Sequence, residues 1–434
     1  MFKKIAAFSL IVLISLCNLF AQKYRIKYSY DDNDPISLEN AIRLALENNY
    51  ELLLTEQDVI IAEQRLKEAK FLYLPQISVN AAATAYNLDY PAVLPDNLGL
   101  RLIMPETGHR GDDFFYGAGV QATQYLYTGG RTSSTVSMAN ATLKEALSRY
   151  EAVKSSVIYK TKEAFLNYLF LQNKETLIKD AARRARKIIS KSGSEKWRRI
   201  LINAEMSVLE GEIGKTEEEL AASHLKMLNA LNKEINSKIH IAGDFIYNPV
   251  EVDLAKITLL AMELRPELKS ALYKLEMDNI AVKLSLAKRY PDVILGLSYD
   301  RLGRNNLTDE NFQATLALKL PLSYDFGTQL KQKQAEQRQT VLRRAAIEDS
   351  IRVQVREAYN KLMYWQGEVS ARADKWEKMN KEISDVENSG LENIDIVKIF
   401  DYYYKTGVSY LEGVKQQMLA IAGLELAVGQ DLRL

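Results

Sequence analysis

Four segments of the chain alternate apolar and polar residues with a period of two, which is the period of a β-strand. They cover residues 77–87, 115–127, 293–301 and 312–322. The polar positions that share one face of two of these segments are Gln121, Thr123, Gln313, Thr315 and Lys319. The apolar positions between them include Val120, Ala122, Phe312, Ala314 and Leu316. The pattern predicts strands with one polar and one apolar face.

The rest of the chain has a helical period. Between residues 131 and 191 apolar residues recur at seven-residue steps, the seam of a coiled coil: Val136, Leu143, Tyr150, Val157, Ala164, Leu171 and Ile178. No Gly or Pro lies between Gly130 and Gly193, so this predicts a helix roughly 90 Å long. The remaining predicted helices cover residues 38–74, 195–234, 254–290, 328–406 and 408–430, with an interruption near Asn388-Ser389-Gly390. A compact globular domain needs no helix of that length, so we expect the helix to bridge two separated places.

The two parts of the chain resemble each other. Ala45-Leu46-Glu47 aligns with Ala261-Met262-Glu263, and the same offset pairs Pro75 with Pro291. Each proline precedes an alternating segment, and a second alternating segment and a very long helix follow. We therefore predict an internal duplication, with repeats at 22–240 and 241–434.

Residues 1–21 have the three parts of a secretory signal. Lys3 and Lys4 form the charged region, an apolar stretch follows, and cleavage is expected after Ala21. A retained anchor helix and a lipidated Cys17 are the two alternatives. Each of these interpretations predicts export.

Composition excludes several classes of protein. Lys and Arg number 57 against 56 Asp and Glu, so there is no basic surplus for nucleic acid. A single Cys and three His argue against a disulfide framework and a zinc site. Because no paired carboxylates, nucleophile motif or phosphate loop stands out, we expect no enzyme, no cofactor and no metal.

Alternating segments of about ten residues suit a transmembrane β-barrel, although a strand of a soluble sandwich has the same period. Export and rod-length helices favour the barrel. Four strands are too few to close one, since the smallest single-chain barrels have eight, and lipid tolerates no open edge. Several chains must therefore share a barrel, and three would give twelve strands.

Several motifs, in their order along the chain, resemble the TolC-type outer membrane efflux protein family. Ser37-Leu38-Glu39-Asn40-Ala41 is similar to that family's first helix, and Leu74-Pro75-Gln76-Ile77 to the entry of its first strand. The family's passage from a strand into the long helix is similar to Tyr125-Leu126-Tyr127-Thr128-Gly129-Gly130-Arg131. Lys405-Thr406-Gly407-Val408-Ser409-Tyr410-Leu411 resembles its hairpin at the periplasmic tip.

The resemblance implies a mainly α protein with membrane β-structure. It would be a homotrimer with a twelve-stranded barrel in the outer membrane, four strands per protomer, continued by a coiled-coil α-helical barrel in the periplasm. The expected partners are outer-membrane lipids, a periplasmic adaptor (membrane fusion) protein and an inner-membrane transporter, for drug efflux or type I secretion.

The resemblance also suggests tip residues. The gate candidates are Tyr403, Tyr404, Lys405, Gly407 and Glu412 in the second repeat, and Gly193, Arg198 and Arg199 in the first. Tyrosine hydroxyls would bond across the closed mouth, or the tyrosines would form a packing cluster. Arg198 and Arg199 would contact an adaptor or a neighbouring protomer, or belong to a solvated turn. The barrel lumen would be lined by the five polar strand positions, Gln121, Thr123, Gln313, Thr315 and Lys319.

Two other functions compete with the exit duct. A periplasmic coiled-coil adaptor would also be exported and helical, but its β-domain would lie between the arms of its hairpin. A secreted hydrolase would need a catalytic constellation, which the sequence does not offer.

Overall fold

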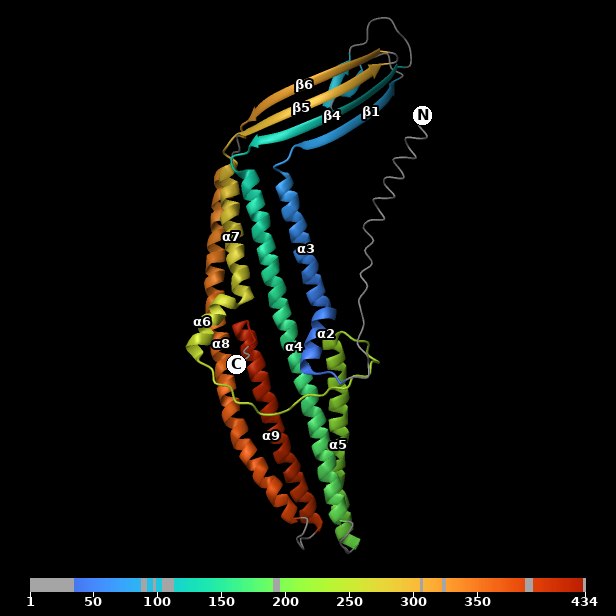
Figure 1. Ribbon diagram of the computed structural model, residues 1–434, viewed down its shortest axis with the longest axis vertical. Helices are drawn as coiled ribbons and strands as arrows, with labels where there is room; N and C mark the ends of the chain where they lie inside the picture. The colour runs from blue at the N-terminus through green and yellow to red at the C-terminus, as the bar shows by residue number, and fades with distance from the viewer. Residues whose placement is uncertain are drawn as a thin grey trace.

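The computed structural model describes residues 35–86, 92–96, 99–103, 113–189, 196–304, 307–321, 325–386 and 393–431. The predicted signal with Cys17, and the gate candidate Gly193, lie outside these residues. The described chain is a long rod of helices that carries a β-sheet at one end, with the strands oblique to the helix axes (Figure 1).

The elements follow one another in two similar series. The first contains α2 (Leu38–Asn48), α3 (Tyr50–Phe71), β1 (Gln76–Tyr86), β2 (Ala92–Asp96), β3 (Gly99–Ile103), β4 (Asp113–Tyr127), α4 (Arg131–Ile189) and α5 (Lys196–Leu231). The second contains α6 (Leu254–Leu264), α7 (Pro266–Ala287), β5 (Asp292–Arg304), β6 (Leu307–Lys319), α8 (Phe326–Val386) and α9 (Asn393–Val428). The helices are 11, 22, 59 and 36 residues long in the first series. In the second they are 11, 22, 61 and 36 residues long. Only the small hairpin β2–β3 lacks a counterpart among the described residues.

Two predicted single helices are each divided in two. The prediction of one helix over 38–74 is wrong, because Asn49 is extended and its side chain accepts a hydrogen bond from the Leu52 amide, which caps α3. The prediction over 254–290 is wrong for a related reason. Pro266 begins α7, and it disfavours a helical conformation at the preceding Arg265.

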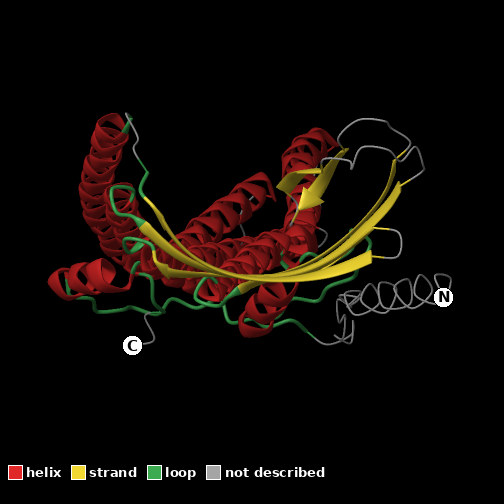
Figure 2. Ribbon diagram, turned by 90° about the horizontal axis from the view of Figure 1, so that it is seen from above, coloured by secondary structure: helices red, strands yellow, loops and turns green. Residues whose placement is uncertain are grey.

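The main sheet is antiparallel, with the strand order β1-β4-β5-β6. Its register aligns Ser78 with Gln121, Gln121 with Ser298, and Ser298 with Gln313. Because side chains alternate between faces, one face is polar along all four strands and the other is apolar. The predicted alternation is therefore present, and the sheet is strongly curved when seen from above (Figure 2).

Below the sheet, the helices form two layers that follow one another along the rod. In the layer next to the sheet, the helices stand side by side in the same order as the strands to which they are joined. Next to the sheet the neighbours run α3-α4-α7-α8, and toward the far end they run α5-α4-α9-α8. Helices α4 and α8 extend through both layers (Figure 1). Each layer is thus an arc of four elements, with an element of the first series at one edge and one of the second series at the other.

A segment between α5 and α6, residues 232–253, crosses the rod where the two layers meet (Figure 1). The Val250 amide donates to the Gln366 side chain at 2.9 Å, and the Gln417 side chain donates to the Asn248 carbonyl at 2.7 Å. At the other end of the segment, Ile241 bridges to Ile36. These bonds tie the second-series helices α8 and α9 to the segment that leaves the first series.

The boundary between the last two helices of the second series does not lie where the sequence placed it. Helix α9 runs without a break through Gly407, so the predicted end of a helix at 406 and the hairpin at Gly407 are wrong. Helix α8 ends at Val386 and α9 begins at Asn393, on either side of the interruption noted near Asn388-Ser389-Gly390, which lies outside the described residues. Gly407 is small for a different reason. A Cβ there would lie 2.5 Å from Leu177 Cδ2 and 2.8 Å from the Trp376 ring, so α9 approaches α4 and α8 closely at this point.

We expect Gly407→Val to destabilise the protein by about 1–3 kcal/mol, the usual cost of overpacking. Gly211→Val is the matched control, since no atom lies within 4 Å of a Cβ built at Gly211, and it should change stability by less than about 0.5 kcal/mol. Denaturant unfolding followed by circular dichroism measures both changes. Equal stability of the two variants would contradict the close approach at Gly407.

Candidate functional site: the tip of the rod and the faces of the sheet

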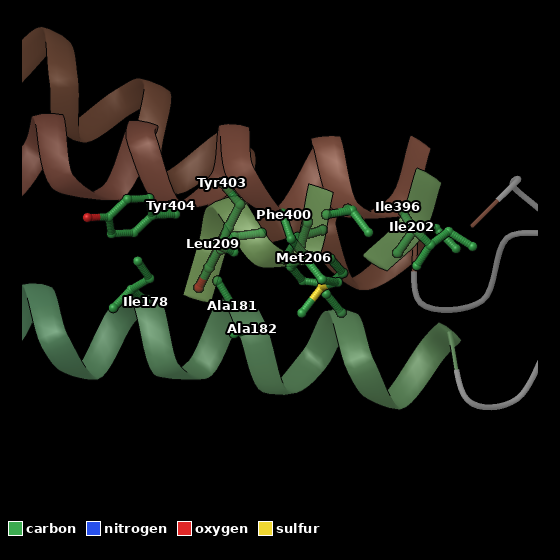
Figure 3. Close-up of a cluster of buried hydrophobic side chains, with 13 residues drawn as sticks. Ile178, Ala181, Ala182, Ile202, Met206, Leu209, Ile396, Phe400, Tyr403 and Tyr404 are labelled. Carbon is green, nitrogen blue, oxygen red and sulfur yellow. The ribbon is translucent and has the colours of Figure 1, made fainter. Parts of the chain in front are cut away.

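The far end of the rod has its own hydrophobic core, which we call the tip cluster (Figure 3). Its buried members are Ile178, Ala181, Ala182, Ala185, Ile202, Met206, Leu209, Ile383, Ile396, Val397, Phe400, Tyr403 and Tyr404. They come from α4, α5, α8 and α9. The cluster therefore joins the two helical hairpins of one protomer to each other.

Tyr403 lies inside the tip cluster, with 4% of its surface exposed. Its ring centroid is 4.9 Å from that of Trp376 and 6.3 Å from that of Phe400. The guanidinium of Arg184 lies over the ring at 5.9 Å. Burial raises the pKa of the Tyr403 hydroxyl, and nearby Arg184 partly opposes that shift.

Tyr404 is equally buried, with 5% of its surface exposed, and it projects from α9 next to Ile178 of α4 (Figure 3). Burial raises the pKa of its hydroxyl to about 12, while a hydrogen bond with the Thr216 side chain on α5 acts in the opposite direction. The geometry thus favours the packing alternative for Tyr403 and Tyr404. A gating role for these two hydroxyls stays a prediction.

The two charged gate candidates of the second series, Lys405 and Glu412, lie on α9 at exposed or partly exposed positions, whereas Gly407 is buried. The Lys405 ammonium is 2.6 Å from Asp401, one turn earlier, and this pairing raises the pKa of Lys405. Glu412 contacts Lys415 at 2.7 Å and Gln416 at 2.8 Å. Both charged candidates are therefore partnered along their own helix. The preceding Tyr402 is 61% exposed.

The first-series candidates lie at the start of α5. Arg199 is exposed, as is Lys196. Arg198 belongs to α5, but its side chain lies outside the described part of the structure, as does Gly193 altogether. Sequence reasoning missed a neighbouring feature, the apolar side chains exposed on the same helix, which are Trp197, Ile200, Leu201 and Val208. Their spacing of three, four and seven residues was the available signal.

The five polar candidates of the strands, Gln121, Thr123, Gln313, Thr315 and Lys319, occupy one face of the sheet by register. At the helical end of that face, Asp292 is aligned with Lys319 and pairs with Arg131 of α4. The opposite face exposes Phe312 (70%), Leu316 (70%) and Val79 (76%) to the surroundings. That the polar face lines a lumen stays a prediction.

Two further features of the sheet were not foreseen. The Asp300 side chain lies over Gly119, where a Cβ would meet the carboxylate. Its Oδ2 has no hydrogen-bond partner among the described residues, although the residue is only 6% exposed. A belt of exposed aromatic residues also surrounds the junctions between helices and strands: Phe71, Tyr73, Tyr125, Tyr127 and Tyr290. Aromatic girdles of this kind flank the apolar band of membrane barrels.

None of the described helices is long and apolar enough to serve as a membrane-spanning helix. Within the same residues, no three His, Cys, Asp or Glu side chains are grouped so that they could hold a metal ion.

Residues 41–191 match the family model of the outer membrane efflux protein. This match confirms the resemblance to the family that the sequence motifs indicated. The family is defined by efflux, not by a catalysed reaction. No curated protein matches the chain.

Solved structures extend the likeness to nearly the whole chain. The *Campylobacter jejuni* CmeC outer membrane channel is 14% identical, with 94% of this chain and 90% of that chain covered and a TM-score of 0.72. The open state of the *Neisseria gonorrhoeae* MtrE outer membrane channel is 14% identical, with 91% and 89% covered and a TM-score of 0.73. The *Vibrio cholerae* outer membrane protein VceC is 13% identical, with 91% and 97% covered and a TM-score of 0.73. At these identities the comparison establishes the fold, which is that of outer-membrane channels.

The buried hydroxyl of Tyr404 predicts a pH effect on stability. Its pKa rises from 10.0 in the unfolded chain to about 12 in the folded one, so the folded state keeps a proton that the unfolded state loses. The stabilising contribution is complete below pH 10 and is lost as the pH rises toward 12.

We therefore expect Tyr404→Phe to make the loss of stability between pH 10 and pH 12 less steep, measured by denaturant unfolding at several pH values. At pH 7 the same change should cost about 1 kcal/mol, because the hydrogen bond with Thr216 is lost. Tyr402→Phe, at an exposed position, is the control and should leave the pH profile unchanged. Identical profiles of stability against pH for the wild type and Tyr404→Phe would refute the raised pKa that we assign to the Tyr404 hydroxyl.

Proposed function

We propose that this chain is one protomer of a homotrimeric exit duct in the outer membrane, part of a tripartite efflux or type I secretion system. The observation that carries the proposal is the position of the open edges of the sheet and of the two helical layers. The sheet and both helical layers are open arcs of four elements, and all three are open on the same two sides.

The edges of the sheet require a partner. Within the described part of the chain, strands β1 and β6 each pair with one neighbour in the four-stranded sheet, so each presents a row of backbone groups that no described strand pairs. The apolar face of the same sheet suits hydrocarbon, where every unpaired backbone group costs several kcal/mol. Pairing β6 of one chain with β1 of the next satisfies these groups, and closure after three chains gives a twelve-stranded barrel.

The helices at the two open sides, α3 and α8, also expose apolar side chains that closing the ring would cover. On the side of β1, α3 exposes Leu54 (68%) and Ile61 (48%). On the side of β6, α8 exposes Leu342 (71%) and Val353 (55%). A head-to-tail ring brings these two different surfaces together in each interface, as cyclic symmetry requires. Three chains would then continue the barrel with a ring of twelve helices.

The closed ring would be a passive conduit. The polar face of the sheet would line the barrel mainly with uncharged Gln, Ser and Thr side chains, together with charged residues such as Lys319 and Asp300. The helical ring would cross the periplasm to the tip. An adaptor and an inner-membrane transporter would dock at the tip and open it, and the transporter would supply the energy. The secretory signal predicted at residues 1–21 and the repeat of the element series, which we attribute to an internal duplication, fit this function.

The alternative function is a periplasmic coiled-coil adaptor. It would need the sheet to be stable in water, and the exposure of Phe312, Leu316 and Leu318 at 70–72% on one face opposes that. The sheet also lies at the end of the rods instead of between two arms of a hairpin (Figure 1).

The mass of the detergent-extracted protein, by light scattering with the detergent contribution subtracted, tests the assembly. We expect three chains per particle, recovered from the outer-membrane fraction. A monomer that stays soluble without detergent would eliminate the duct and favour the adaptor.

A pair of lysine substitutions tests which face of the sheet meets lipid. Leu316→Lys places a charge on the apolar face and should destabilise the barrel in a bilayer by about 2–4 kcal/mol, so that trimers dissociate at lower temperature. Thr315→Lys, one residue away on the polar face, should leave the trimer intact. Heating series on gels compare the two, and equal sensitivity would rule out a lipid-facing role for Leu316.

A further inference from the structure

The two hairpin ends of the chain carry opposite charge. Between positions 183 and 199 the sequence has eight basic residues and one acidic residue. Between positions 382 and 401 it has six acidic residues and one basic residue. The first segment covers the end of α4 and the start of α5, and the second covers the end of α8 and the start of α9. Part of this charge is compensated within the protomer, because Arg183 and Arg184 contact Asp180, Arg186 contacts Glu210 and Asp401 contacts Lys405. The exposed Arg199 on one hairpin and the exposed Glu382 on the other favour association between unlike hairpins.

The basic hairpin presents an apolar stripe. Ile200, Leu201 and Val208 are 66%, 45% and 62% exposed, and Trp197, one turn before Leu201, is 56% exposed. Arg199 is exposed within this stripe. Trp and Arg next to aliphatic side chains form the kind of surface that dominates protein interfaces.

The acidic hairpin presents a hollow. A cavity of about 270 Å³ lies between α8 and α9 and is lined by Met379, Glu382, Ile383, Ile399 and Tyr402. Its walls are mostly apolar, and Glu382 is exposed at its rim. The cavity can accept apolar side chains, and the carboxylate can pair with a basic residue beside them.

The stripe and the hollow lie at one height along the rod. Ile202 of α5 and Ile383 of α8 both belong to the tip cluster, so the start of α5 and the end of α8 are level. In the helical layer at this end, α5 is one edge and α8 is the other. Closing a ring therefore brings α5 of one copy next to α8 of the following copy.

We infer that the α5 stripe of one protomer docks into the α8–α9 hollow of the next, with Ile200 and Leu201 in the hollow and Arg199 paired with Glu382. The occupant of the hollow is thus a second copy of this chain, selected by charge. The inference rests on the proposed function, because it needs the head-to-tail ring. Around that ring, basic and acidic hairpins alternate, so the contact is strengthened at low salt.

Disulfide trapping tests the contact. The only cysteine of the chain is Cys17, inside the segment expected to be removed. Chains with Ile200→Cys and chains with Tyr402→Cys, carrying tags of different size, are produced together and oxidised in membranes. We expect a disulfide-linked pair of unlike chains, at least tenfold more abundant than with Ile200→Cys and Tyr364→Cys. Tyr364 is the matched control, since it is 58% exposed on α8 but lies about 33 Å further from the tip than the end of that helix.

Charge reversal provides the second measurement. Arg199→Glu should reduce the trapped pair several-fold, and the addition of Glu382→Lys should restore it. Light scattering on the same preparations separates the outcomes. Particles of three chains with no trapped pair, or with a pair insensitive to both charge changes, would overturn the inference and leave the exit duct intact. Monomers would overturn the exit duct itself.

Discussion

An unpaired strand edge next to an apolar sheet face is the feature on which the rest of this structure depends. Each main strand is joined to a helix by only a few residues, α3 to β1, β4 to α4, α7 to β5 and β6 to α8. The order of strands therefore fixes the order of helices below them, and the open edges of sheet and helices fall on the same sides. A chain that must close its sheet by pairing with a copy of itself must close its helical layers in the same step.

The tip cluster decides where such a ring could open. It contains side chains from all four helices at the far end of the protomer, and Tyr403 and Tyr404 lie among them. Separating the two hairpins of one protomer would expose this core to water, at about 25 cal/mol for each Å² of apolar surface. The proposed contacts between protomers at this end would combine opposite charges, which solvent and salt screen, with the few apolar side chains of the α5 stripe. In the proposed ring, opening between protomers would therefore be less costly than separating the two hairpins of one protomer.

The sequence predicted the faces of the sheet well and the tip less well, for physical reasons. Alternation follows from the backbone geometry of a strand, so Gln313 and Thr315 share a face in any register that keeps the strand. Three consecutive tyrosines on a helix point in directions about 100° apart. Which of Tyr402, Tyr403 and Tyr404 faces inward depends on how α9 packs on α4 and α5, and α9 alone does not reveal it. Gly407 was misread because glycine serves both turns and close helix contacts; only the positions of Leu177 and Trp376 distinguish the two.

The polar face of the sheet also bears on selectivity in the proposed duct. Its candidate lining residues are mainly uncharged, and the carboxylate of Asp292 at the helical end is paired with Arg131. Glu412 and Lys405, the charged candidates near the tip, are each paired within α9. Selecting ions by charge requires rings of groups whose charge is not already compensated. These groups are compensated. Asp300 and Lys319 also lie on the polar face by register and would form charged rings in the proposed barrel, so selection by charge would depend on them, and any other choice of cargo would fall to the transporter that loads it.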